Sequence, residues 1–131
     1  MRSRHELADY FRRKGYEEEV GKQILEKLQR FGLVDDEKFA RSWVENRRLL
    51  KPISKRKLTQ ELRQKRIADD VVDIVLMEDE TDELATLKEL VEKRRRQTKY
   101  QDDMKLMQYL AGQGFNYGDI KQALQQEEDD E

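Results

Sequence analysis

Cysteine is absent from this chain of 131 residues, and proline and histidine each occur once. Without cysteine there are no disulfides, thiolate metal sites or cysteine nucleophiles, which suits a reducing compartment such as the cytoplasm. Long apolar runs are also missing: the longest, residues 71–77, contains Asp73 and is far shorter than the roughly 20 residues that cross a bilayer. We therefore expect a cytoplasmic protein with no membrane segment and no secretory signal.

Apolar residues are scarce, whereas charged residues are abundant. Hydrophobic residues make up 36% of the chain and charged residues 43%, against roughly 25% charged in an ordinary globular domain. So many charges need a large surface, which excludes a thick core. The composition favours an elongated, thin, helical protein.

The charges are sorted into blocks along the chain, although the net charge is only −2. Residues 1–40 balance, residues 41–66 carry ten basic residues against two acidic ones, and residues 67–92 carry ten acidic residues against one basic one. A second basic cluster at residues 93–99 precedes an acidic end. Blocks of this size create local potentials that steer charged partners even when the whole chain is near neutral.

Apolar residues recur at helical spacing almost throughout, and no alternating strand pattern competes with them. Helix punctuation separates the segments: Ser3 with Glu6 is typical of a capping box, Gly15 and Gly114 of left-handed helix ends, and Ser54 of a helix cap after the single proline. The sequence predicts an all-α protein. The expected core contains Leu7, Phe11, Ile24, Phe39, Trp43, Leu58, Leu62, Val75, Leu110 and Leu124.

One helix-turn-helix pattern occurs three times, at offsets of 51 and then 48 residues. The matching residues are Leu7, Phe11 and Tyr16, then Leu58, Leu62 and Ile67, then Leu106, Leu110 and Phe115. Longer helices, expected from residue 36 to about 48 and from 82 to about 96, precede the second and third patterns. The sequence therefore predicts an elongated tandem array of three-helix repeats.

We place the predicted repeats at residues 1–34, 35–80 and 81–125, followed by a disordered acidic tail at 126–131. The first repeat lacks its leading helix in this sequence, so we expect a chain trimmed at its N-terminus.

A basic stripe follows the helix that is expected after Ser54. At about 100° per residue, Lys55, Arg56, Arg63 and Arg66 fall within an arc of about 100°. A solvated charged face is the ordinary interpretation of such a run. The positions of Arg56, Arg63 and Arg66 hold His5, Arg12 and Gly15 in the first repeat, and Met104, Ala111 and Gly114 in the third. The first and third repeats are expected to fold without the full set of cations at these positions, so folding does not require them. We therefore predict that the basic stripe contacts phosphate or an acidic protein groove.

Catalysis is poorly supported by the residues. The single histidine, His5, lies near the N-terminus, and none of the three serines has a neighbouring base that the sequence identifies. Gly112-Gln113-Gly114 lacks the rest of a phosphate-binding loop. We predict that the protein is not an enzyme and has no metal site or cofactor. Trp43 and Tyr16 could stack on bases, but their periodicity favours burial.

Four linked parts of the sequence resemble one known family. They are Ser3–Leu7 with Lys14–Tyr16, Phe31–Arg41, Leu58–Lys65, and Tyr109–Leu110 with Gly114–Phe115. The second part is the most diagnostic, because generic helices rarely give its order of an apolar residue, two aspartates, two further residues, phenylalanine and alanine. The chain resembles the RecX family of bacterial recombination regulators over nearly its whole length. Arg66 stands where that family usually has glycine, which costs roughly 1 kcal/mol if the helix end is left-handed.

The resemblance implies a repeat protein that binds the RecA recombinase, above all its filament on single-stranded DNA. Members of this family restrain RecA by lying in the filament groove or by blocking its extension, which lowers ATP hydrolysis, strand exchange and stimulated repressor cleavage. This implies a role in homologous recombination, DNA repair and the SOS response, and we expect a monomer. The predicted RecA- or DNA-binding residues are Arg47, Arg48, Lys51, Lys55, Arg56, Arg63 and Arg66.

A second interpretation stays open, in which the helix-turn-helix units bind the phosphates of single- or double-stranded DNA directly. Loss of Arg56 and Arg63 would then weaken binding to bare single strands. A pure interaction scaffold would ignore bare DNA and bind RecA filaments.

Overall fold

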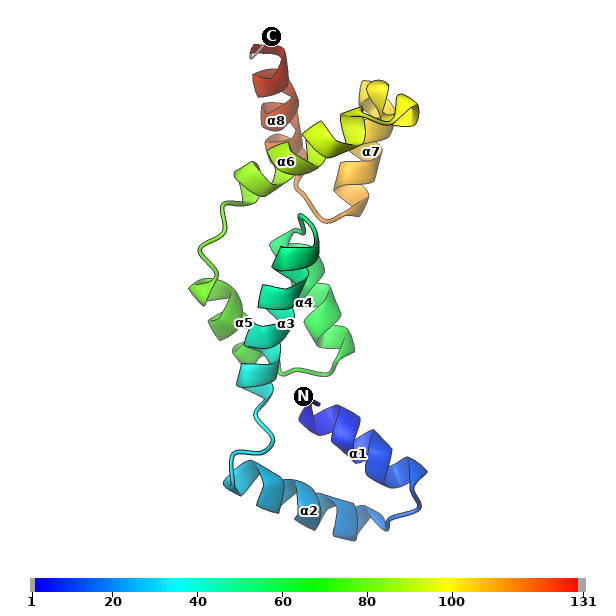
Figure 1. Ribbon diagram of the computed structural model, residues 1–131, viewed down its shortest axis with the longest axis vertical. Coiled ribbons are helices and arrows are strands. Elements are labelled where there is room, and N and C mark those ends of the chain that lie inside the picture. Colours follow the sequence, from blue (N-terminus) through cyan, green and yellow to red (C-terminus); the bar gives the residue numbers. More distant parts are fainter. Residues whose placement is uncertain (1, 130–131) are drawn as a thin grey trace. The chain divides into compact units, whose positions relative to one another are not determined.

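The computed structural model describes residues 2–129, and within them the chain forms eight α-helices, one short 3-10 helix and no strand (Figure 1). The helices are α1 (Arg4–Arg13), α2 (Glu18–Arg30), α3 (Asp36–Leu50), α4 (Lys55–Gln64), α5 (Asp69–Glu78), α6 (Glu83–Arg95), the 3-10 helix η1 (Thr98–Gln101), α7 (Asp103–Gly112) and α8 (Tyr117–Asp129). This confirms the all-α prediction. No helix in the described range is long and apolar enough to cross a membrane.

The predicted punctuation lies at the helix ends. Ser3 Oγ and Ser54 Oγ each accept a backbone N–H from the first turn of the following helix, at 3.2 and 3.0 Å. Gly15 and Gly114 have φ values of 86° and 98° just after α1 and α7. Because a first turn leaves backbone donors without intrahelical partners, such caps fix where a helix begins. Local sequence alone therefore sets these ends.

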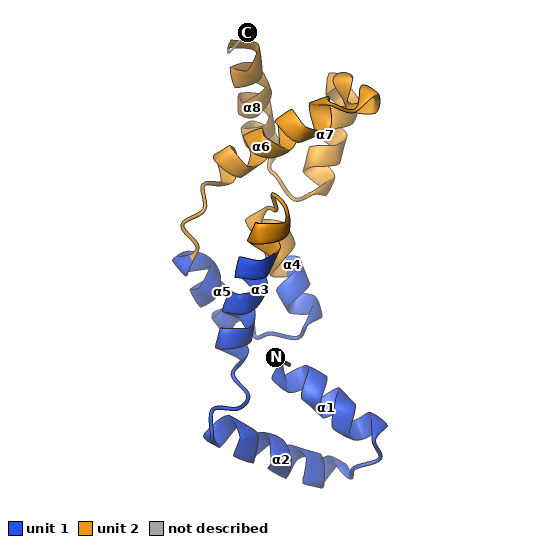
Figure 2. Cartoon of the chain, viewed as in Figure 1, with its two compact units in different colours: residues 1–46, 60–78 blue, residues 47–59, 79–131 orange. Residues whose placement is uncertain are grey.

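The chain divides into two compact units (Figure 2). Unit 1 comprises residues 1–46 and 60–78, and unit 2 comprises residues 47–59 and 79–131. The division passes through α3 and α4, so each unit takes one part of these two helices. The predicted repeat boundaries stay a prediction.

In unit 2, α6, α7 and α8 enclose one apolar cluster. Its buried members are Leu87, Leu90, Val91, Leu106, Leu110, Phe115, Ile120 and Ala123. Tyr100 of η1 packs on Tyr109 of α7 with ring centroids 5.0 Å apart, and both rings adjoin the cluster. Three helices are thus enough to bury this core.

In unit 1, α3 and α5 each bury several apolar side chains, whereas α1 and α2 together bury only one. Phe39 and Val44 of α3 and Val75 of α5 are 7%, 6% and 3% exposed. Helix α1 contains no buried residue, and α2 buries only Gly21 and Leu25. The α1–α2 pair therefore has the thinnest core of the described chain.

The predicted core is confirmed for five of its ten residues. Phe39, Leu58, Leu62, Val75 and Leu110 are buried. The other five, Leu7, Phe11, Ile24, Trp43 and Leu124, are only half-buried. The burial expected for Tyr16 is wrong, because its side chain is 50% exposed. Leu7, Phe11, Ile24 and Tyr16 all lie on the α1–α2 pair, whose inner face lacks a covering helix in the described chain.

The structure also differs from the disordered tail expected at residues 126–131. Helix α8 continues to Asp129, and residues 130–131 lie outside the described residues. Glu127 accepts a hydrogen bond from Arg95 Nε at 3.1 Å. This ion pair gives the acidic end of α8 a cationic partner that the local sequence does not reveal.

Candidate partner-binding surface

Arg56 lies on the first turn of α4, in unit 2, and is exposed. The start of α4 is held from two sides: Ser54 Oγ caps it and also donates to the Gln113 carbonyl at 2.7 Å. Gly114 approaches so closely that a Cβ there would lie 2.6 Å from Ser54 Oγ. The α7–α8 turn therefore fixes the end of α4 that carries Arg56.

The Arg48 side chain points into the interior of unit 2. Its guanidinium donates to the Asp79 carboxylate at 2.7 Å and to the Ile53 carbonyl, and the Arg48 and Asp79 side chains are only 14% and 10% exposed. Burial works to raise the pKa of Asp79, but hydrogen bonds from Thr81 and Arg48 outweigh it and hold the pKa below its ordinary 3.8. Because the folded-state pKa is depressed, this stabilisation is present above about pH 3.8 and is lost as pH falls through the folded value.

Arg95 makes the same contacts in the third repeat. Its guanidinium donates to the Tyr100 carbonyl, five residues on, and to Glu127, 32 residues on. The corresponding distances from Arg48 are five residues to Ile53 and 31 to Asp79. The sequence-based predictions missed this shared set of arginine contacts, although the sequence does show an arginine near the end of each leading helix. Arg48 therefore stabilises the fold of unit 2.

The remaining predicted cations of unit 2 differ in their exposure and in the contacts they already make within the protein. Lys51 is exposed beside the exposed Leu50. Lys55 Nζ donates to the Asp79 carbonyl at 3.1 Å, and the Lys55 backbone N–H donates to Glu83. Arg47 is half-buried and takes part in an interaction of its own. Lys51 and Arg56 are thus the most accessible cations of the predicted set in this unit.

Two of the predicted binding residues, Arg63 and Arg66, lie in unit 1. Arg63 Nε donates to Asp69 at 3.0 Å, but the two side chains are 61% and 71% exposed. An exposed pair of this kind contributes only ~0–1 kcal/mol, so a partner could displace Asp69 at little cost. Arg66 is exposed and has a φ of 60°, the left-handed conformation that Gly15 and Gly114 adopt at the matching turns. A side chain in this conformation costs roughly 1–2 kcal/mol.

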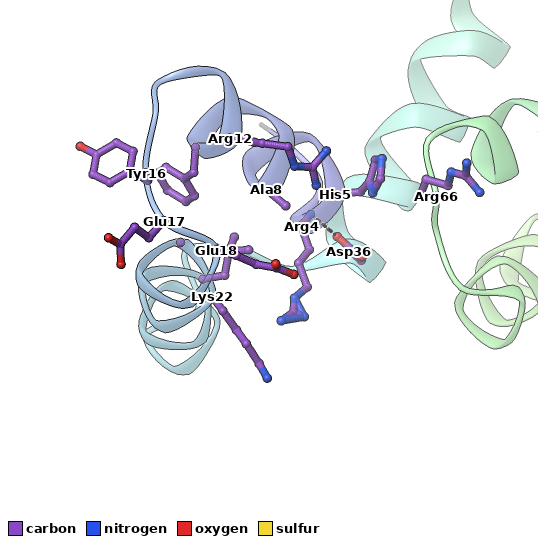
Figure 3. Close-up of a pocket in the computed structure, with 13 residues that line it drawn as sticks. Arg4, His5, Ala8, Arg12, Tyr16, Glu17, Glu18, Lys22, Asp36 and Arg66 are labelled. Carbon is purple, nitrogen blue, oxygen red and sulfur yellow. Dashed lines mark hydrogen bonds between the residues drawn. The ribbon is translucent and has the colours of Figure 1, made fainter.

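A cavity of about 600 Å³ lies in unit 1 between α1 and α2 (Figure 3). Arg12, His5 and Arg66 lie along its edge in the view of Figure 3. The Arg4 backbone N–H donates to Asp36 at 2.9 Å, which ties the start of α1 to the start of α3.

Part of the cavity wall is apolar. It is formed by Phe11, Tyr16 and Gly21, whose matching residues in the third repeat are Leu110, Phe115 and Ile120. These three belong to the cluster that α6 covers in unit 2. The cavity therefore corresponds to an uncovered repeat core rather than to a separate ligand site.

Trp43 and Tyr16, the two aromatic residues considered for base stacking, have different surroundings. Trp43 stacks on Phe39 with ring centroids 6.2 Å apart, and its Nε1 donates to Glu61 at 3.1 Å. Lys65 Nζ lies 5.2 Å from the Trp43 ring centroid. The Trp43 ring is therefore held by contacts within unit 1, whereas the side chain of Tyr16 is half exposed.

Comparison with known proteins places these repeats in a family. Domain models described as the first, second and third three-helix domains of RecX match residues 1–28, 35–76 and 80–124. A regulatory protein RecX of Streptomyces lividans is 32% identical over 138 residues, which cover 98% of this chain and 73% of the relative. The chain belongs to the RecX family.

Other RecX proteins agree with this assignment. A regulatory protein RecX of Mycobacterium tuberculosis is 45% identical over 75 residues, which cover 57% of this chain and 43% of the relative. The crystal structure of RecX from Lactobacillus salivarius is similar with a TM-score of 0.81 and 24% identity, over 96% of this chain and 85% of that one. The array of helical repeats is therefore confirmed as the RecX fold. In residues 2–129 of this family member, no group of three or more acidic or histidine side chains could hold a metal ion.

Proposed function

We propose that this chain regulates the RecA recombinase by binding RecA or its filament on single-stranded DNA, and that it restrains ATP hydrolysis, strand exchange and stimulated repressor cleavage. Its family membership, in a group of regulatory proteins, supports the general role. The proposal places the chain in the cytoplasm, in recombination, DNA repair and the SOS response. It assigns the chain no catalytic step, no cofactor and a monomeric state.

One observation carries the choice of contact residues. Arg56, Arg63 and Arg66 are exposed, and the third repeat has Met104, Ala111 and Gly114 at the same positions. Arg66 even adopts the left-handed conformation in which glycine is better tolerated. A residue that adds strain and that the scaffold does not need points to a function outside folding.

Lys51 supplements these three arginines, and Lys55 and Arg47 are secondary contributors because the fold already engages them. Arg48 is left out, because its guanidinium is bound inside unit 2. The expected partner surface is phosphate or a carboxylate-rich protein groove. Such charge complementarity sets the encounter rate and register of a complex more than its affinity, and it weakens with salt.

The test measures RecA ATPase on single-stranded DNA with increasing amounts of the protein. We expect the wild-type chain to lower the rate and the Arg56→Gln/Arg63→Gln double variant to require about tenfold more protein for the same effect. The matched control is Lys88→Gln/Lys105→Gln, which removes two exposed cations from α6 and α7. Equal inhibition by wild type and the arginine variant would remove these residues from the proposal, and an unchanged ATPase rate would overturn the RecA role.

A second candidate function is direct DNA binding, and the exposed Arg56 and Arg63 on one helix favour it. Titration of bare single-stranded DNA over a salt series separates the two. If both arginines contact phosphates, their loss should reduce the slope of log K against log salt by about 0.7 for each contact. Identical slopes for wild type and variant would eliminate this candidate and leave the RecA proposal standing.

A further inference from the structure

Helix α5, in unit 1, has an exposed apolar stripe on the side away from its core. Val72 and Val75 are buried, at 1% and 3% exposure, whereas Ile74 and Met77 are 44% and 84% exposed. Ile74 and Met77 are three residues apart, so they lie on one helix face. The sequence pattern assigns only Val75 of this helix to the core and makes no prediction for Ile74 or Met77.

The other repeats show that the fold does not require apolar residues at these places. With the offsets of 51 and 48 residues, Ile74 and Met77 match Gln23 and Glu26 on α2, and Gln122 and Gln125 on α8. All four of these polar residues are exposed. The two apolar side chains are therefore particular to the second repeat, and exposed apolar groups on one face are typical of a contact surface.

Two carboxylates lie next to the stripe, on its N-terminal side. Asp70 and Asp73 are exposed and fall with Ile74 and Met77 within an arc of about 100° on α5. In the described part of the chain no basic side chain pairs with either of them; Asp70 accepts only the N–H of Val71. The other acids of α5 are paired, Asp69 with Arg63 and Glu78 with Arg41. The face thus presents two apolar anchors beside two uncompensated negative charges.

We propose that this face of α5, the Ile74–Met77 stripe with Asp70 and Asp73, docks a cationic amphipathic segment of a partner protein. The apolar side of the segment would cover Ile74 and Met77, and its lysine or arginine side chains would pair with Asp70 and Asp73. Helix-on-helix docking of this kind uses anchors spaced three or four residues apart, and Ile74 and Met77 are three residues apart. The inference rests on the proposed function for the identity of the protein that supplies the segment.

The first experiment uses the full chain and does not depend on RecA. A fluorescent 18-residue helical peptide of leucine and lysine, with leucine on one face, is titrated and its polarisation measured. We expect saturable binding that Ile74→Gln/Met77→Gln weakens at least about tenfold, and that Asp70→Asn/Asp73→Asn weakens more at low salt than at high salt. Glutamine occurs at the matching places of α8, so the first variant should fold, which circular dichroism checks.

Met104→Gln is the matched control, because Met104 is another exposed methionine, at 65%, on α7. It should leave peptide binding unchanged. Equal weakening by this control, or equal binding by wild type and the α5 variants, would overturn the inference. Concentration-dependent dimerisation of the wild-type chain that the Ile74→Gln/Met77→Gln change abolishes would assign the face to a second copy and would also overturn it.

The second experiment identifies the partner by measuring binding of the same variants to RecA filaments and to bare single-stranded DNA. We expect Ile74→Gln/Met77→Gln to weaken filament binding at least about tenfold and to leave binding to bare DNA unchanged. If the wild-type chain fails to bind filaments, the proposed function fails, and the peptide titration still decides the inference. Filament binding that is unaffected by the α5 change would overturn the assignment of the face to RecA.

Discussion

Arg48 and Arg63 are both paired with an aspartate, yet their surroundings give the two ion pairs different roles. The Arg48–Asp79 pair is 14% and 10% exposed, and Arg48 also satisfies the Ile53 carbonyl. The Arg63–Asp69 pair is 61% and 71% exposed. A buried pair cannot lose one partner without leaving the other uncompensated, whereas water replaces the lost partner of an exposed pair.

We therefore predict that Arg48→Ala lowers the free energy of unfolding by about 3 kcal/mol, because it leaves Asp79 without its cation. Arg63→Ala, the matched change at an exposed pair, should lower it by no more than about 0.5 kcal/mol. Urea denaturation followed by circular dichroism measures both. Similar losses in the two variants would show that Arg48 does not hold unit 2 together.

A second prediction at the residue scale concerns Arg66 and its φ of 60°. Arg66→Gly should raise the free energy of unfolding by about 0.5–1 kcal/mol, because glycine tolerates the left-handed conformation. Arg66→Ala removes the same charge and keeps the strain, so it should not stabilise the protein. Under the proposed function both changes weaken the effect on RecA equally. A glycine variant no more stable than the alanine variant would contradict the strain argument.

At the scale of elements, the turns between helices differ in what surrounds them. The turn after α1 is open: a Cβ on Gly15, with φ 86°, would meet no atom within 4 Å. The turn after α7 is packed, because a Cβ on Gly114, with φ 98°, would lie 2.6 Å from Ser54 Oγ and 3.3 Å from Arg56 Cβ. The second turn thus serves as a support for the start of α4, within unit 2.

We predict that Gly114→Ala lowers the free energy of unfolding by at least about 2 kcal/mol, because backbone strain and a clash with Ser54 add together. Gly15→Ala carries the strain alone and should cost about 1 kcal/mol. Thermal unfolding of the two variants, compared with wild type, measures the difference. The packing argument fails if both substitutions shift the midpoint equally.

At the scale of the whole molecule, the repeats bury their cores to different extents. Leu106, Leu110 and Phe115 on α7 and the turn after it are 0–4% exposed, whereas at the matching places Leu7 and Phe11 are half-buried and Tyr16 is 50% exposed. In repeat proteins each repeat is stabilised mainly by its own core and by its immediate neighbours. Stability should therefore be uneven along the chain.

Native-state hydrogen exchange tests this unevenness. We expect amides in α1 and α2 to exchange at least about tenfold faster than those in α7 and α8, because few apolar contacts oppose their local opening. Mass spectrometry of peptides from residues 4–30 and 103–129 gives the comparison. Equal protection in the two segments would show that the uncovered face costs the first repeat nothing.

The sequence by itself determined most of the helices, the helix ends that carry a cap or a glycine, and the repetition of the pattern. Caps such as Ser3 and Ser54, and the glycines after α1 and α7, act within one turn, so no distant residue is needed to place them. Helical periodicity likewise follows from local spacing, and four linked segments, of which Phe31–Arg41 was the most diagnostic, indicated the family.

Only the tertiary structure decided which cations are accessible and which apolar residues are not needed for the core. Arg48 and Arg56 are the same residue type in the same basic block of the sequence. Arg48 points inward because it binds the Asp79 carboxylate, which is 31 residues away in the chain. Periodicity predicted burial for Val75 of α5 but made no prediction for Ile74 and Met77, because their exposure depends on whether another helix covers them. Burial and pairing are properties of segments brought together by folding, so they are absent from any local pattern in the chain.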